Sequence, residues 1–334
     1  MIRAKLCAHS SQDDWGSQGF VTYNDETAAR GSNGRYLINY DSTTGENYIG
    51  VDYWSILDGV TLGAAGRGSV RIETEKTYTH GLFIIDLAHM PSSRCGLWPA
   101  FWTASNVSYP SNGEIDIIEN IHMAIVNKNT LHTDTGCQLN GNEPPYLSQQ
   151  TDIQNSYNCD DQATYSNFGS QYQYQGCSGT STDAHAYGDA FNIIGGGVYA
   201  MEWTSAAIKM WHFPATNIPS DITSGSPLPA GWGQPVFTTL HGDCNIDHFF
   251  KDHRIILNTD FCGNWAGLPS VWKQSGCYDM KDYPTCQSYV AANPGLYSTA
   301  YWSVNSIKVY QDVVVSSSSS SVAMTSTRTS STAA

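Results

Sequence analysis

The sequence Asn-Gly-Glu-Ile-Asp-Ile-Ile-Glu-Asn at residues 112–120 sets three acids in an isoleucine-rich, strand-like segment. Acidic and apolar residues alternate with period two, so Glu114 and Asp116 face one side of the predicted strand. Glu119 follows Asp116 by three positions, and a regular strand would turn it to the opposite side. One extra residue, a β-bulge at positions 117–118, returns Glu119 to the same side. The segment therefore predicts a bulged strand with three acids on one face and buried isoleucines on the other.

Short strand-like segments separated by Gly, Asn, Ser and Pro lie on both sides of this strand. They alternate apolar and polar residues as half-buried strands do, and they cover 69–78, 82–88, 98–103, 198–204, 208–213, 254–259 and 303–310. Helical patterns are confined to two short stretches at 247–252 and 285–292. Many short strands without alternating helices predict an all-β protein built as a sandwich of packed sheets.

Composition narrows the possible partners. Only 14% of the residues are charged, whereas the chain has 30 Gly, 20 Tyr and 10 Trp, which is typical of β-rich proteins. The net charge of −14 argues against nucleic acid and against anionic membrane surfaces, because Lys and Arg must neutralise phosphate there. No apolar run approaches the ~20 residues of a membrane span. A neutral polymer is compatible with this charge.

Nine cysteines indicate a disulfide framework, because none forms the Cys-x-x-Cys pairs of zinc or thioredoxin-like sites. Eight lie within residues 95–286, enough for four bridges whose pairing stays open, and Cys7 is left over. We therefore expect an extracellular or cell-wall protein, with a cytosolic protein carrying free thiols as the alternative. Residues 1–10 lack the apolar core of a signal peptide, so either the gene model begins late, with a first exon missing, or export uses another signal; we expect the former.

The acid segment fits glycoside hydrolysis. A retaining glycosidase needs two carboxyl groups roughly 5–5.5 Å apart, one as nucleophile and one as general acid and base. Glu114 and Glu119 lie about four strand steps apart once the bulge is absorbed, and long side chains can close most of that gap. Asp116 between them raises one pKa, which keeps one carboxyl protonated. A solvent-exposed acidic strand and a calcium site are the alternatives, but calcium prefers ligands from several directions. We predict catalysis with no metal and no cofactor.

The chain resembles glycoside hydrolase family 16, in the laminarinase-type branch that carries the extra residue in its Glu-Ile-Asp-Ile-Ile-Glu motif. The resemblance extends over roughly residues 30–311. In the order and spacing of its motifs the chain is similar to fungal endo-1,3(4)-β-glucanases. It rests on Gly-Arg-Gly-Ser-Val-Arg at 66–71, Gly-Leu-Trp-Pro-Ala-Phe-Trp at 96–102 and Thr-Leu-His-Thr at 130–133. It implies a β-jelly-roll sandwich of two antiparallel sheets with a concave substrate cleft. It also implies that Glu114 is the nucleophile, Glu119 the acid/base and Asp116 the residue that orients the nucleophile.

The same resemblance suggests substrate-binding residues. Trp98 and Trp102 are four positions apart and would stack on sugar faces, with core packing as the alternative. His132 would lie beside the acid/base, and Arg67 would contact sugar hydroxyls in a distal subsite unless it serves a turn or ion pair. Core packing is the expectation for three further tryptophans: Trp203, Trp211 and Trp265.

The predicted organisation is a poorly patterned segment at 1–30, a catalytic domain at 31–312 and a Ser/Thr-rich tail at 313–334. Residues 137–195, rich in Asn, Gln, Tyr and Ser, are interpreted as a long stapled loop region. The tail cannot bury a core, so it is either an O-glycosylated linker or a disordered end.

The predicted function is endo-hydrolysis of β-1,3 or mixed β-1,3/1,4-glucan by a retaining mechanism in a monomer. One alternative is a cell-wall glucan transglycosylase, although those resemble a shorter Glu-x-Asp-x-Glu spacing. The other is a glucan-binding protein without activity, although such proteins lose a catalytic glutamate and both are present here.

Overall fold

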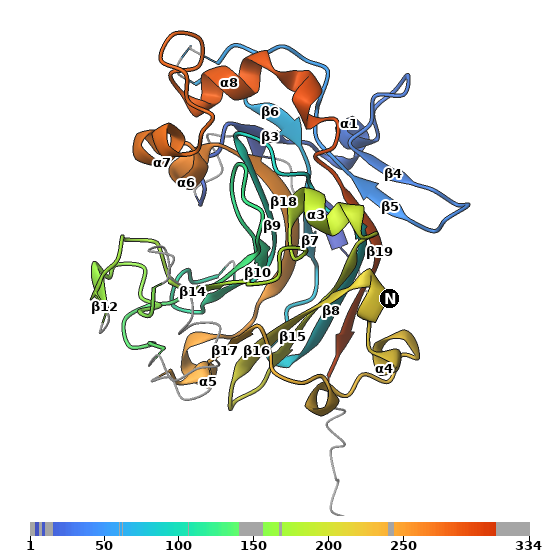
Figure 1. Ribbon diagram of the computed structural model, residues 1–334, viewed down its shortest axis with the longest axis vertical. Helices are drawn as coiled ribbons and strands as arrows, with labels where there is room; N and C mark the ends of the chain where they lie inside the picture. Colours follow the sequence, from blue (N-terminus) through green and yellow to red (C-terminus); the bar gives the residue numbers. More distant parts are fainter. Residues whose placement is uncertain are drawn as a thin grey trace, which may run out of the picture.

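The computed structural model describes residues 4–6, 9–10, 16–59, 61, 63–105, 107–139, 156–166, 169–239 and 244–311. Two large antiparallel sheets form most of this part of the chain (Figure 1). The first sheet has seven strands in the order β1 (Ala4–Leu6), β7 (Arg71–Thr74), β18 (Arg254–Phe261), β9 (Leu97–Ala104), β10 (Glu114–Glu119), β11 (Lys128–His132) and β14 (Cys177–Thr180).

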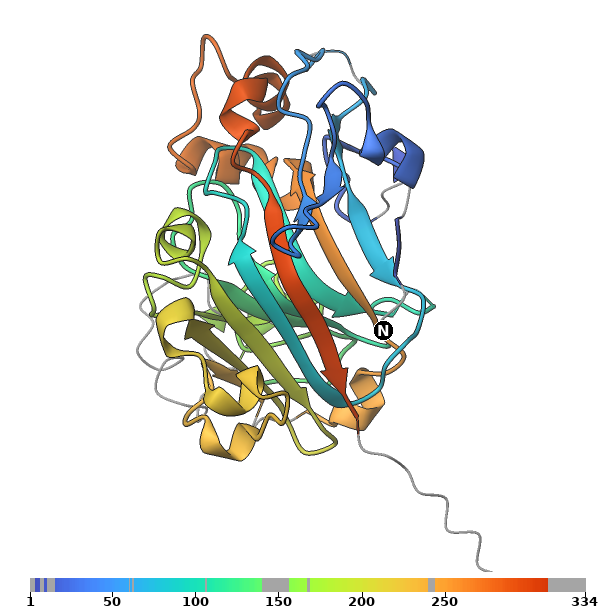
Figure 2. The ribbon, with the colours of Figure 1, turned by 90° about the vertical axis from the view of Figure 1, so that its right-hand side faces the viewer.

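The second sheet also has seven strands and packs against the first (Figure 2). Their order is β17 (Phe237–Thr238), β16 (Ile208–Pro214), β15 (Gly197–Trp203), β8 (Gly81–His89), β19 (Trp302–Tyr310), β5 (Asn47–Ile49) and β4 (Ile38–Tyr40). Two smaller sheets are formed by β2 (His9–Ser10), β3 (Val21–Tyr23) and β6 (Arg67–Ser69), and by β12 (Tyr165–Ser166) and β13 (Gly169–Ser170). The predicted antiparallel sandwich is confirmed.

The main core lies between the two sheets because each strand turns alternate side chains inward. Ile115 of β10 and Ile85 of β8 are fully buried there, together with Trp203 of β15. Burying one such side chain contributes about 1.5–3 kcal/mol. The second sheet is apolar on its outer face as well, where the segment at 215–235 covers Trp211 and its neighbours with Ile222 and Trp232. The outer face of the first sheet carries the acids.

Helices are short, and those within the segment at 215–235 lie against the outer face of the second sheet. The helices are α1 (Glu26–Arg30), α3 (Gly188–Ile193), α4 (Ser220–Thr223), α5 (Ile246–Phe249), α6 (Gly263–Ala266), α7 (Pro269–Gln274) and α8 (Cys286–Ala292), with 3-10 turns η1 (Ala215–Asn217), η2 (Pro229–Gly231) and η3 (Pro294–Tyr297). The two predicted helical stretches correspond to α5 and α8. In α8, Thr285 and Ser288 form a reciprocal capping box. Within the described ranges, no helix has the length and apolarity that a membrane crossing needs.

Four disulfides confirm the predicted framework and settle its pairing. The pairs are Cys95–Cys277, Cys137–Cys244, Cys159–Cys177 and Cys262–Cys286. Cys7 and the tail at 312–334 lie outside the described residues. The region predicted as a stapled loop is stapled by Cys159–Cys177, but it also contains α3 and a full edge strand, β14, which pairs with β11. Polar composition concealed that strand.

Residues 16–30, part of the segment predicted as poorly patterned, pack against the rest of the described chain. Val21 and Tyr23 are buried in a second apolar cluster, and β3 pairs in parallel with β6. The Phe20 N–H donates to the Phe261 carbonyl at 2.6 Å, which joins this segment to the end of β18. Strands of two or three residues are too short to display a period, so their pattern does not reveal them in the sequence.

Candidate active site

A β-bulge in β10 determines where the three acids point. Against β9, Asp116 pairs with Trp102 and Ile118 with Phe101, so Ile117 has no partner. Against β11, the register shifts between Asp116 and Glu119, so that two isoleucines lie opposite one residue. Ile117 and Ile118 are both buried in the main core, at 1% and 0% exposure. The predicted bulge is confirmed, and it returns Glu119 to the face of Glu114 and Asp116.

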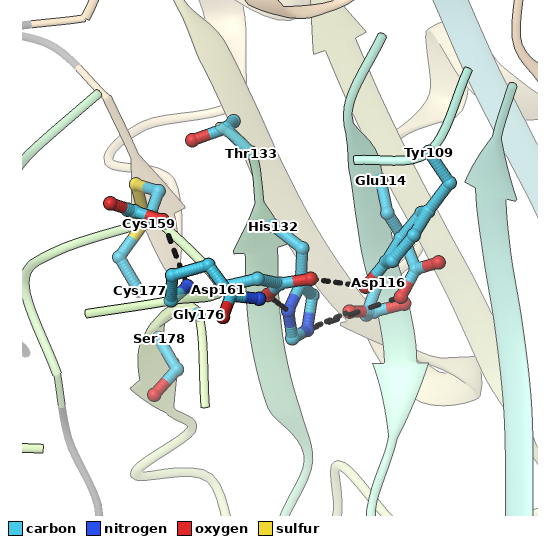
Figure 3. Close-up of polar contacts among 12 residues, drawn as sticks. Tyr109, Glu114, Asp116, His132, Thr133, Cys159, Asp161, Gly176, Cys177 and Ser178 are labelled. Carbon is cyan, nitrogen blue, oxygen red and sulfur yellow. Dashed lines mark hydrogen bonds and ion pairs between the residues drawn. A yellow bond between two sulfur atoms is a disulfide. The ribbon is translucent and has the colours of Figure 1, made fainter. Parts of the chain in front are cut away.

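His132 of β11 lies directly across from Glu114 in the ladder. Its Nε2 is 3.4 Å from Asp116 Oδ2 and 4.0 Å from Glu114 Oε1 (Figure 3). Asp116 is 2% exposed, and its Oδ2 makes no hydrogen bond within the described part of the chain, so the contact with His132 is an ion pair. The structure thus brings together three residues that sequence reasoning placed in one site.

Two further residues extend this cluster. His132 Nδ1 is 2.6 Å from Asp161 Oδ1, and the Tyr109 hydroxyl donates to Asp161 Oδ2 at 2.5 Å (Figure 3). Asp161 lies in the segment after β11, two residues beyond the disulfide-bonded Cys159. Neither residue was predicted from the sequence, because both belong to irregular segments with no motif of their own, and Asp161 also lies far from β10 in the chain.

His132 carries the positive charge of the cluster. Burial lowers the pKa of His132, but Asp161 and Asp116 outweigh burial and raise that pKa well above its ordinary value. In return, His132 lowers the pKa of Asp161 below its ordinary value, against the effect of burial. An imidazolium between two carboxylates therefore lies next to Glu114 near neutral pH.

The remaining carboxyl groups hold protons more tightly than free carboxylic acids. Burial, and then the Asp116 charge, raise the pKa of Glu119 to about 8. The Trp98 indole N–H donates to Glu119 Oε1 at 2.7 Å and acts in the opposite direction, as does the cation of Lys128, which pairs across the ladder from Glu119. The pKa of Glu114 is raised well above its ordinary value by burial and Asp116. Close carboxyl groups of this kind retain at least one proton at neutral pH.

Tryptophans border the acids on the same face. Trp98 contacts Glu119 through its indole, and Trp102 is the ladder partner of Asp116. Both are half-buried, as aromatic rings that can stack on a ligand would be. Trp265, expected in the core, instead packs edge-on against Trp98 with ring centroids 5.5 Å apart. Trp203 and Trp211 are buried, as expected.

Arg67 is not brought to the site. Its side chain is fully buried, and its guanidinium donates to the backbone carbonyls of Asp52, Ser55, Val290 and Ala291. It also lies over the Tyr297 ring, 5.3 Å from the centroid. An enclosed guanidinium cannot reach sugar hydroxyls, so the expected sugar contact gives way to a structural role that ties β6 to α8.

The ligand-type atoms of Glu114, Asp116 and His132 lie within 4.8 Å of one another, a spacing that a metal ion could bridge. A metal needs the neutral imidazole as ligand. Here the two flanking carboxylates raise the pKa of His132, which favours the cationic form. The cluster therefore has its own compensating cation, and its groups can exchange protons and, as carboxylates, can attack an electrophilic carbon.

Comparison with known proteins places this geometry in a family. The profile of XgeA-like catalytic GH16 domains matches residues 8–310. A probable endo-1,3(4)-β-glucanase of Aspergillus fumigatus is 40% identical over 92% of this chain and 43% of its own length. An endo-1,3(4)-β-glucanase of Arthroderma benhamiae is 40% identical over 88% of this chain and 60% of its own length. The chain thus spans less than half of the Aspergillus relative.

Solved structures show the same jelly-roll sandwich. Laminarinase 16A of Phanerochaete chrysosporium, solved with two 6-O-glucosyl-laminaritriose molecules in donor and acceptor sites, is 32% identical, with a TM-score of 0.76 over 92% of this chain and 94% of that one. An elongating GH16 β-1,3-glucosyltransferase is 34% identical, with a TM-score of 0.75 over 92% of this chain and 100% of that one. With the match of the family profile over residues 8–310, this chain belongs to glycoside hydrolase family 16, among the XgeA-like catalytic domains.

Proposed function

We propose that this protein is a retaining endo-β-glucanase that hydrolyses β-1,3 or mixed β-1,3/1,4-glucan. The observation that carries the proposal is the bulge in β10, which turns Glu114 and Glu119 to one face on either side of Asp116. The names of the fungal relatives, endo-1,3(4)-β-glucanases, support the substrate class. The bound laminaritriose derivative of the Phanerochaete enzyme supports it as well.

In the first step, the ionised Glu114 attacks the anomeric carbon of the scissile bond. Glu119, whose pKa is raised to about 8, is protonated at neutral pH and gives its proton to the glycosidic oxygen. The carbon–oxygen bond breaks, the downstream glucan leaves with a new hydroxyl group, and the upstream sugar remains as an ester on Glu114. The negative charge that Glu114 loses in forming the ester appears on Glu119, which has given up its proton.

In the second step, Glu119, now a carboxylate, takes a proton from a water molecule as that water attacks the anomeric carbon. The ester bond breaks, Glu114 regains its charge, and the sugar leaves with its original configuration. Two inversions at one carbon give net retention. Glu119 recovers its proton in the same step, so the cycle is closed without an added cofactor.

His132 would favour the ionised form of Glu114 during this cycle, against burial and the Asp116 charge, which raise the Glu114 pKa. His132 Nε2 is the nearest described cationic nitrogen to Glu114, at 4.0 Å. Its charge offsets that of Asp116, which would otherwise oppose ionisation of the nucleophile. The proton of the cluster is then held on Glu119, the acid on the far side of the bulge.

Sugar binding is assigned to the tryptophans. Trp98 and Trp102 present half-exposed rings on the face of the acids, where C–H faces of glucose units can stack. Trp265 joins them through its contact with Trp98. A neutral, hydroxyl-rich chain adds no further negative charge to a site that already holds several carboxyl groups.

The disulfides and the packing of β3 support proposals for the location of the enzyme and the extent of its catalytic domain. Four disulfides favour an extracellular or cell-wall location, since thiols stay reduced in the cytosol. We place the catalytic domain from before residue 20 to residue 311, because β3 packs with the rest. Action as a monomer remains a prediction.

A glucan transferase is the second candidate, and one observation favours it. The elongating GH16 β-1,3-glucosyltransferase has the same fold at 34% identity. A sugar hydroxyl would replace water in the second step. The bulged spacing in β10 argues against the transglycosylases that have the shorter Glu-x-Asp-x-Glu spacing.

Reducing ends released from laminarin, lichenan and cellulose test the proposal. We expect release from the first two and little from cellulose, and oligosaccharide analysis separates hydrolysis from chain elongation. Glu114→Ala should abolish release, whereas Glu75→Ala, which replaces an exposed acid just after β7, should not change it. Binding of glucan without release in the wild type would instead support a glucan-binding protein.

A further inference from the structure

Two asparagines lie buried beside the bulge. Asn127 and Asn129 are each 1% exposed, and Asn129 projects among the apolar side chains between the two sheets, where its amide is 3.2 Å from Met210 Sδ. A polar amide in an apolar core costs free energy unless it is well hydrogen-bonded. Neither residue touches the carboxyl groups directly, and the catalytic steps above do not use them.

Both side chains bond to the backbone of the bulge. The Asn127 Nδ2 and the Asn129 Nδ2 donate to the same carbonyl, that of Ile117, at 2.9 and 2.8 Å. The Asn127 Oδ1 accepts the Glu119 backbone N–H at 3.0 Å. Asn127 therefore connects the carbonyl of the extra residue to the amide of the acid that follows it.

These side-chain hydrogen bonds replace the strand hydrogen bonds that the bulge removes. An extra residue disrupts the ladder locally and leaves backbone groups without their strand partners. An unpaired buried carbonyl or N–H costs as much as a lost hydrogen bond. Asn129 is the residue of β11 that faces the two bulged isoleucines, since Asp116 pairs with Thr130 and Glu119 with Lys128.

We propose that Asn127 and Asn129 are positioning residues that hold the bulge, and through it aim Glu119 at the sugar. Without them the Ile117 carbonyl and the Glu119 N–H lose these partners, so only strand pairing holds the bulge, and the Glu119 carboxyl is less precisely placed next to Trp98. This inference rests on the proposed function, and within it the two asparagines affect Glu119, the acid/base, and leave Glu114, the nucleophile, in place. Glu114 lies on the other side of the bulge, in regular pairing with His132 and Ala104.

Because only Glu119 should be affected, a substrate that needs its proton can be compared with one that does not. Asn127→Ala and Asn129→Leu remove the two amides, and Asn127→Ala still leaves the Asn129 donor for the Ile117 carbonyl. On laminarin, which needs a proton from Glu119, we expect kcat to fall roughly 10- to 100-fold with little change in KM. With 2,4-dinitrophenyl β-laminaribioside, the leaving phenolate needs no proton. Its release in a single turnover should stay within about three-fold of the wild type.

Asn192→Leu is the matched control. Asn192 also bridges a backbone N–H and a carbonyl, both of Met90 and both at 2.9 Å, but it lies in α3, away from the acids. We expect its melting temperature to fall as in the bulge variants, with kcat on laminarin unchanged.

Three results separate the possibilities. Equal losses on laminarin and on the activated substrate would overturn the proposal, because the defect would then include Glu114. Unchanged kcat in both bulge variants despite lowered melting temperatures would also overturn it, since the amides would be merely structural. A wild type that releases neither sugar nor phenolate would instead refute the proposed function itself.

Discussion

Single residues determine how charge is shared around β10. Four carboxyl groups, those of Glu114, Asp116, Glu119 and Asp161, converge on one imidazole, His132. Because Asp161 binds Nδ1 and Asp116 faces Nε2, the ring is held in its cationic form with both nitrogens directed at acids. Glu114 and Glu119, the two proposed catalytic acids, then differ in their distance from the positive charge of His132.

Replacing Asp161 with Asn should weaken this arrangement. The pKa of His132 should fall toward its ordinary value, since its largest raising influence is the Asp161 carboxylate. Once that pKa lies below the assay pH, Glu114 loses its nearby cation, and kcat/KM on laminarin should fall about ten-fold. Nitrogen NMR of the imidazole and kinetics at pH 7 check both parts. Asp183→Asn, which removes the partner of the remote buried His212, should leave activity unchanged; equal losses in the two variants would contradict this role.

The pH profile follows from Glu119. A general acid works while protonated, so activity should be present below about pH 8 and be lost as the pH rises through the Glu119 pKa. Trp98→Phe removes an indole N–H that stabilises the carboxylate, so the basic limb of kcat should move to higher pH. In Trp102→Phe the limb should stay, because that indole donates to Asn258 instead. A downward shift in Trp98→Phe would rule out this assignment.

At the scale of elements, the strands show what a sequence can predict. The longer strands were anticipated to within a few residues, because alternation over five or more positions is distinctive. The bulge was predicted because three acids at unequal spacing had no other way to share a face. Asp161, Tyr109 and the two asparagines could not be found, because they meet β10 only through tertiary contacts that no local period encodes.

The bulge also predicts how insertions and deletions act. Deleting Ile117 restores plain alternation with the three acids still on one face, so reduced but measurable hydrolysis should remain. Inserting one Ala between Ile118 and Glu119 turns Glu119 toward the core and should abolish hydrolysis. Rates on laminarin, with near-UV circular dichroism as the control for folding, compare the two variants. Loss of activity in a well-folded deletion variant would show that hydrolysis needs more than the three acids on one face of β10.

At the scale of the molecule, two packed sheets provide the rigid support and irregular segments complete the site. The disulfide Cys159–Cys177 fixes the segment that carries Asp161 against β14, and Thr133 N–H donates to the Cys159 carbonyl at 2.8 Å. The pairing could not be derived from sequence, because eight cysteines allow many connectivities. The N-terminal strands likewise depend on partners distant in the chain.

Two disulfides of similar span should therefore differ in effect. Replacing Cys159 and Cys177 with Ser, or Cys262 and Cys286 with Ser, opens loops of 18 and 24 residues, and each should cost about 3 kcal/mol of stability. Only the first pair should also lower kcat/KM at 25 °C, because Asp161 loses its anchor. Thermal melts and kinetics on the folded variants measure both quantities. Equal kinetics in the two variants would show that Asp161 is held by other contacts.

Capture of the covalent sugar ester tests the central claim most directly. The protein would be incubated with 2,4-dinitrophenyl 2-deoxy-2-fluoro-β-laminaribioside, which forms the ester but releases it slowly, and then mapped by peptide mass spectrometry. A nucleophile at Glu114, with Glu119 as acid/base, predicts one added disaccharide on the peptide segment that contains Glu114, located on that residue by fragmentation. An adduct on Glu119 or Asp116, or inverted product with no adduct, would contradict it.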